Sequence, residues 1–235
     1  MECATLPSAR NIKIPLACDV VPLVRENINL ITVIEENIDY TRVLYKSQVC
    51  IVRRVSVLTL GAAICHQHSL AKVLAAPKVL GYWITNSVPP FGMMMYADCG
   101  NITIIDHINQ AIQISDMSRI RELIYLCITQ ILKMNRMGIA HSNLHHLCSI
   151  LVTHSNEIRF TRFEHSRSIS GVYSHDVYDF INAVFLLCDA FHPVHKLLID
   201  HPFYDHDYVS SFFNNIPSAR PVEYVVSARI SEVFQ

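Results

Sequence analysis

The stretch from Gly138 to Val152 reads GIAHSNLHHLCSILV and connects a strongly periodic segment to a pair of short apolar ones. It holds three of the chain's thirteen histidines and one of its eight cysteines. Three interpretations compete: a metal site, a catalytic loop that has lost its chemistry, or a polar connection between a helix and a strand. The choice among them decides the fold and the function predicted for the whole chain.

The segments on either side of this stretch have clear patterns. Before it, apolar residues at helical spacing predict a helix over 120–132, with Asp116 or Ser118 as its cap and Gly138 in the turn after its end. After it, the segments SILVT and NEIRFTRF predict a hairpin, and a second apolar helix is expected over 176–191.

The first hundred residues read differently. Residues 28–56 are rich in isoleucine, valine, tyrosine and threonine, which predicts strands interrupted by a turn at 37–39. An alanine- and leucine-rich helix is expected over 58–78, and further strands in 78–85 and 89–97. This order predicts an α+β fold with a small strand-rich lobe, followed by a mainly helical one.

Composition narrows the class of protein. Apolar residues make up 51% of the chain and charged residues 17%, which is typical of a globular protein. The formal net charge of −1 gives no bulk reason to expect nucleic acid as a partner, and no apolar run is long enough to span a membrane. The cysteines are scattered without a CxxC pair, which favours reduced thiols in an intracellular protein.

At this point the sequence resembles a protein kinase domain over roughly residues 40–190. GIAHSNL is similar to the G-I-x-H-R-D-L of the catalytic loop, and IRFTRFEHS is similar to I-x-L-x-D-F-G of the metal-binding loop. CIVRR resembles the strand that carries the nucleotide-binding lysine. The resemblance implies a two-lobed kinase-like fold, with an N-terminal lobe over 1–96 and a reduced, mainly helical C-terminal lobe over 97–235.

The departures from the kinase pattern fall on its chemistry. Asn143 stands where the resemblance places the catalytic base, and an amide has no useful basicity at neutral pH. Arg162 stands where an aspartate holds magnesium, and its cation repels a metal ion. Cys148 replaces the asparagine that binds a second magnesium.

The nucleotide-binding lobe is equally altered. Arg53, or Arg54 in an alternative alignment, replaces the lysine, and no glutamate occurs between Glu36 and Glu122 to pair with it. No glycine precedes Gly61, so a glycine-rich phosphate loop is absent from the sequence. Residues 165–175 are too few for a full activation segment.

Framework positions are retained. The resemblance gives His141 and Phe163 packing roles, and gives Asp176 the role of an aspartate that begins a buried helix and accepts hydrogen bonds from the catalytic-loop backbone. The sequence therefore predicts a pseudokinase that has no catalytic residues and no required cofactor. Its predicted function is to bind and regulate another protein, such as a kinase or a kinase substrate. Short, eroded kinase relatives of this type occur in large DNA viruses.

Two alternatives stay open. A divergent kinase that keeps ATP binding through Arg53 predicts stabilisation by nucleotide. A zinc-stabilised interaction module predicts a metal site among the residues of the opening stretch: His141, His145, His146 and Cys148. The histidine-rich stretch 192–207 is expected to be a solvated loop with short helical pieces. The sequence does not specify the partner or the oligomeric state.

Overall fold

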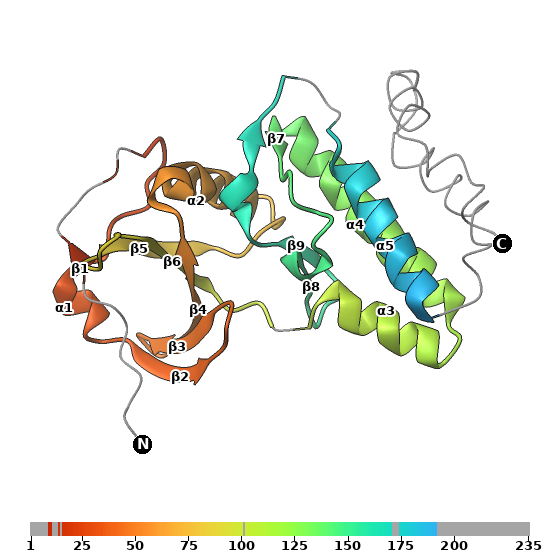
Figure 1. Cartoon of the computed structure of the whole chain (residues 1–235), viewed down its shortest axis with the longest axis horizontal. Helices are drawn as coiled ribbons and strands as arrows, with labels where there is room; N and C mark the ends of the chain where they lie inside the picture. Colours follow the sequence, from red (N-terminus) through yellow and green to blue (C-terminus); the bar gives the residue numbers. More distant parts are fainter. Residues whose placement is uncertain (1–8, 11–13, 15, 101, 171–173, 192–235) are drawn as a thin grey trace. The chain divides into compact units, whose positions relative to one another are not determined.

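The computed structural model describes residues 9–10, 14, 16–100, 102–170 and 174–191 (Figure 1). The stretch 192–207, for which a solvated loop is predicted, lies outside them. The described residues form two compact units. The first is drawn from Met1–Asn101 and Thr161–His165, and the second from Ile102–Phe160 and Ser166–Gln235. Strands and helices are both abundant, so the prediction of an α+β fold is confirmed at that level.

The first unit is built on a six-stranded antiparallel sheet in the order β1-β5-β6-β4-β3-β2. Its strands are β1 (Ala9–Arg10), β2 (Thr32–Glu36), β3 (Thr41–Tyr45), β4 (Gln48–Val55), β5 (Val79–Thr85) and β6 (Gly92–Ala97). Strands β3 and β4 are joined by Lys46 and Ser47, which both have positive φ angles, of 48° and 63°. Two such residues make a tight hairpin turn, which the sequence pattern alone did not predict.

The two faces of this sheet bury different groups, since side chains alternate along each strand. One face carries an apolar cluster that includes Val43, Val52, Trp83 and Met95. Helix α2 (Val57–Ala71) packs against β5 and β6, and the short helix α1 (Arg25–Ile28) precedes β2. The Ser56 hydroxyl caps α2 by accepting a hydrogen bond from the backbone N–H of Leu58 at 3.3 Å.

Helix α2 is shorter than expected. It was predicted to continue to residue 78, but it ends at Ala71. Leu74 adopts a left-handed φ of 59°, and the backbone N–H of Ala75 bonds the Leu70 carbonyl at 2.9 Å. These features close the helix before the chain enters β5.

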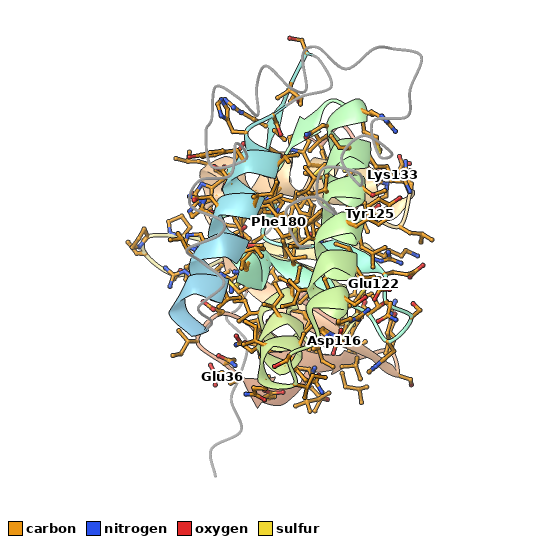
Figure 2. All side chains as sticks on the ribbon, turned by 90° about the vertical axis from the view of Figure 1, so that its right-hand side faces the viewer. Glu36, Asp116, Glu122, Tyr125, Lys133 and Phe180 are labelled. Atoms are coloured by element: carbon orange, nitrogen blue, oxygen red, sulfur yellow. The ribbon has the colours of Figure 1, made fainter. Side chains whose placement is uncertain are left out.

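The described residues of the second unit form three helices, α3 (Ile104–Gln113), α4 (Met117–Arg136) and α5 (Asp176–Phe191). Helices α4 and α5 lie side by side, with Phe180 of α5 fully buried, while Glu122 and Lys133 project from the exposed side of α4 (Figure 2). Two small ladders complete the unit: β8 (Ile150–Val152) with β9 (Ile158–Phe160), and β7 (Ile139–Ala140) with β10 (Arg167–Ser168).

The helices predicted on either side of the opening stretch are confirmed. Asp116 caps α4 by accepting a hydrogen bond from the Arg119 N–H at 2.9 Å, and Gly138 follows the helix with a left-handed φ of 74°. The hairpin over β8 and β9 and the helix over 176–191 are also present. Helix α3 was not predicted, although Thr103 and Asp106 form a capping box at its start.

Two glycine substitutions are expected to change the free energy of unfolding in opposite directions. A Cβ at Gly81 would lie 2.7 Å from Cγ of the buried Leu23, so Gly81→Ala is expected to destabilise the fold by about 1–3 kcal/mol through overpacking. A Cβ at Gly61, inside α2, would lie 3.5 Å from its nearest neighbour. Gly61→Ala is therefore expected to stabilise by about 0.5–1 kcal/mol. Urea denaturation measures both; equal effects of the two variants would contradict the packing described for β5.

Candidate functional site

Arg53 on β4 is the central charge of the first unit. Its side chain is only 11% exposed, and its guanidinium lies 3.5 Å from the carboxylate of Glu164, which is 17% exposed. Arg53 Nε also donates a hydrogen bond to the Asp39 carbonyl at 3.2 Å. The short 3-10 helix η2 (Phe163–His165) carries Glu164 and packs against α2. The charge that a kinase balances with a glutamate on the following helix is balanced here from a distant segment.

Arg162 lies immediately before η2 and forms a second ion pair. Its guanidinium donates a hydrogen bond to the Asp39 carboxylate at 2.9 Å. Asp39 lies in the turn between β2 and β3, the position where the resemblance expects the phosphate loop. The Arg162 side chain is 21% exposed and that of Asp39 is 56% exposed, so water weakens this pair more than the Arg53 pair.

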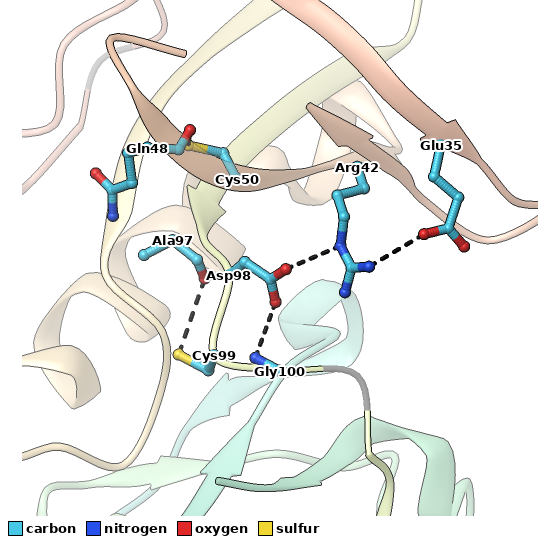
Figure 3. A network of polar contacts seen from close by, with 8 residues as sticks. All are labelled: Glu35, Arg42, Gln48, Cys50, Ala97, Asp98, Cys99 and Gly100. Carbon is cyan, nitrogen blue, oxygen red and sulfur yellow. Dashed lines mark hydrogen bonds and ion pairs between the residues drawn. The ribbon is translucent and has the colours of Figure 1, made fainter. Parts of the chain in front are cut away.

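A third set of charges lies at the end of β6. Arg42 on β3 donates to the carboxylate of Asp98 at 2.9 Å and to that of Glu35 at 3.1 Å (Figure 3). The other Asp98 oxygen accepts a hydrogen bond from the Gly100 N–H at 2.9 Å, which fixes the chain leaving the sheet. Burial, and then the negative charge of Asp98, raise the pKa of the Cys50 thiol.

Strand pairing places two of these arginines on one face of the sheet. Arg42 pairs with Ile51, two residues before Arg53, and Arg53 pairs with Met94. Tyr96 lies on the same face. Burial raises the pKa of its hydroxyl, whereas the charge of Arg53 and the hydrogen bond between Arg53 and Tyr96 lower it. The face thus presents guanidinium groups whose charges are already matched by carboxylates of the same unit.

The opening stretch forms the polar centre of the second unit. Asp176, only 1% exposed at the start of α5, accepts hydrogen bonds from the backbone N–H groups of His141 at 2.8 Å and Ser142 at 2.7 Å. The Ser174 hydroxyl donates to the same carboxylate at 2.8 Å. These bonds hold Ser142 in a left-handed conformation, with φ of 60°. The contact implied by the kinase resemblance is therefore present in the structure.

The other predicted site residues are divided between the two units. His141 is fully buried, its ring 6.0 Å from that of Phe160, and Asn143 is 9% exposed; both lie in the second unit. Cys148 is half-buried in the 3-10 helix η1 (Leu147–Ser149). Phe163 is fully buried and belongs to the first unit.

The histidines of the opening stretch do not converge. His145 and His146 are exposed, with their rings 4.1 Å apart, whereas His141 is buried. Within the part of the chain that the structure describes, no group of three or more histidine, cysteine or acidic side chains is placed to hold a metal ion. The zinc alternative therefore has no ligand set among these residues.

Sequence reasoning missed the acidic half of the first-unit site. Asp39, Asp98 and Glu164 were not identified, because each lies in a turn or short helix without hydrophobic periodicity. A weak signal was available for Glu164, since it is a carboxylate two residues after Arg162 in the segment that resembles the metal-binding loop. The carboxylate that pairs with Arg53 is that of Glu164, which lies far from β4 in the sequence.

Comparisons with known proteins find similar chains among solved structures only. No family model matches this chain, and no curated protein matches it. Among solved structures, the chain is similar to WaaP in complex with acyl carrier protein, with a TM-score of 0.48 and 11% sequence identity over 86% of this chain and 88% of that one. Among the described residues, no helix combines the length and apolar character needed to cross a membrane.

Removing the charge of Glu164 is expected to lower the free energy of unfolding more than removing the charge of Glu122, although Glu122 lies closer to its arginine partner. Glu164→Gln leaves the mostly buried Arg53 uncompensated and is expected to destabilise by about 1–3 kcal/mol. The control is Glu122→Gln, whose carboxylate lies 2.6 Å from Arg119 but is 52% exposed; we expect a change within about 0.5 kcal/mol. Chemical denaturation compares them, and a larger effect at Glu122 would contradict the role given to burial.

The Asp176 carboxylate is expected to be the most costly polar group to remove from the second unit. Asp176→Ala leaves the backbone N–H groups of His141 and Ser142 without their acceptor, so we expect a loss of about 3 kcal/mol or more. Asp106→Ala is the control, because it removes the exposed capping box of α3 at a cost of about 1 kcal/mol. Thermal unfolding followed by circular dichroism measures both. Similar melting temperatures would argue against a structural role for Asp176.

Proposed function

We propose that this protein has a kinase-like fold without phosphotransfer activity and acts by binding another protein. One observation carries the proposal. The two residues that the resemblance aligns with the nucleotide lysine and the magnesium aspartate, Arg53 and Arg162, are ion-paired with the chain's own Glu164 and Asp39. A kinase or a kinase substrate is the class of partner that such a fold suits best.

The residues at the positions that the resemblance aligns with catalytic ones oppose each step of phosphotransfer. Magnesium needs carboxylate or carbonyl oxygens, and Arg162 offers a cation instead. A nucleotide phosphate would have to displace Glu164 from Arg53 or Asp39 from Arg162. The aligned base position, Asn143, carries an amide that accepts no proton at neutral pH. Self-pairing of the arginines is thus the physical reason to expect a pocket without nucleotide.

Nucleotide binding is expected to be absent from the wild-type protein. A ligand at one hundred times its Kd adds about 2.7 kcal/mol of stability, which raises the Tm of a protein of this size by several degrees. We expect the Tm to be unchanged by millimolar ATP, with or without magnesium, in a thermal-shift measurement. Magnesium-dependent stabilisation together with phosphate transfer to a protein substrate would contradict the proposal. Stabilisation by ATP alone would favour the alternative of a nucleotide-binding, non-catalytic protein.

A matched variant tests the cause of the exclusion. Asp39→Asn with Glu164→Gln removes both carboxylates while keeping the size of each side chain, so Arg53 and Arg162 become available to phosphates. This double variant is expected to gain ATP-dependent stabilisation that the wild type lacks. A second double variant, Asn143→Asp with Arg162→Asp, introduces the two aspartates of the kinase pattern. It is expected not to produce phosphotransfer, because the lysine–glutamate pair and the glycine loop are still missing.

A further inference from the structure

One end of the six-stranded sheet carries a shallow pocket of about 520 Å³. Three segments meet around it: the turn between β2 and β3, the end of β4 with the start of α2, and the turn before β6. The lining residues used below are Ile38, Asp39, Arg53, Arg54, Pro90 and Phe91. None of them has a role in the framework contacts of the second unit.

The end of the sheet that carries this pocket has three highly exposed apolar side chains. Ile38, Leu58 and Val88 are 102%, 95% and 90% exposed, and they are the most exposed large hydrophobic side chains among the described residues. Ile38 lines the pocket, Leu58 directly follows a lining residue, and Val88 precedes Pro90 by two positions. Large exposed apolar side chains on segments that meet at one end of a sheet are typical of surfaces that bind a partner.

The same surface carries a positive charge that the chain leaves unmatched. Arg54 is exposed, its guanidinium lies 3.8 Å from the centre of the Phe91 ring, and no carboxylate of the described residues forms an ion pair with it. Stacking on an aromatic ring keeps a guanidinium ordered while its edge stays open to an anion. The carboxylate that lines the pocket, Asp39, is already paired with Arg162.

We propose that this sheet-end surface, formed by Ile38, Arg54, Leu58, Val88 and Phe91, binds an extended acidic segment of a partner protein. Apolar side chains of that segment would contact Ile38, Leu58 and Val88, and a flanking carboxylate would pair with Arg54. This inference rests on the proposed partner-binding function and names where, and by which chemistry, the partner is held. Hot spots of protein interfaces combine apolar anchors with arginine in the same way.

Two other occupants fit the charges less well. A symmetric second copy brings the same patch against itself, which places Arg54 of both copies in one interface without a matching carboxylate. An anionic membrane surface is bound by clusters of about four to eight basic residues, whereas Arg54 is the one unmatched cation among the residues of this surface. An acidic segment with apolar side chains satisfies both features of the patch.

The test uses the full-length protein and a fluorescein-labelled peptide in which glutamates flank leucine and phenylalanine. Binding by fluorescence anisotropy is expected to weaken about tenfold or more in Arg54→Glu, and about five- to tenfold in Leu58→Ser with Val88→Ser. Lys72→Glu is the control, because it makes the same charge change at the exposed far end of α2 and is expected to leave binding unchanged. Unchanged melting temperatures establish that the variants fold.

Several outcomes would overturn the proposal. One is that a peptide with glutamine in place of glutamate binds as tightly as the acidic peptide, or that Arg54→Glu binds the acidic peptide as tightly as the wild type. Another is a dimer, seen by sedimentation, that Leu58→Ser disrupts. A third is Arg54-dependent binding to phosphatidylserine vesicles without binding to the peptide. Failure here is distinguishable from failure of the proposed function. If a captured partner still binds after all sheet-end substitutions, the proposed surface is wrong but the proposed function stands. If the protein transfers phosphate from ATP, the proposed function is wrong irrespective of peptide binding.

Discussion

A guanidinium that is mostly withdrawn from water must have its charge matched nearby, and Arg53 imposes this constraint on the first unit. Its partner, Glu164, comes from a segment far along the chain, so Thr161–His165 belongs with the sheet rather than with its own sequence neighbours. Once η2 is in place against α2, Arg162 is positioned to reach Asp39, and the turn between β2 and β3 is tied to the same face. The charge of Arg53 thus accounts for the placement of η2 and, through Arg162, for the contact with the turn between β2 and β3.

The second unit contains a buried negative charge that is stabilised by hydrogen bonds. Its buried carboxylate, Asp176, is matched by backbone N–H groups and a hydroxyl rather than by an arginine. Those bonds determine the path of the loop at His141 and Ser142, irrespective of which side chains follow. The path of this backbone therefore depends on Asp176 and not on the exposed side chains of His145 and His146.

The sequence predicted the elements whose stability comes from their own periodicity. Helices α4 and α5 have apolar residues at regular spacing, and their limits were found within a few residues. Helix α3 was missed, although the Thr103–Asp106 capping box was visible in the sequence. The ion pairs of Arg53 and Arg162 were beyond prediction for a physical reason. Each joins residues on separate segments, and no local pattern records which carboxylate the fold brings to a cation.

Because Thr161–His165 belong to the first unit, a fragment that contains only the N-terminal part of the chain is incomplete. A fragment that ends at Asn101 would contain the complete six-stranded sheet and α2 but would lack η2. It would expose the surface of α2 that η2 covers and leave the guanidinium of Arg53 without its counter-charge. The sheet-bearing half is therefore discontinuous in sequence, and no single proteolytic cut releases it intact. The sheet-bearing half therefore includes residues that are synthesised only after helices α3 and α4 of the other half.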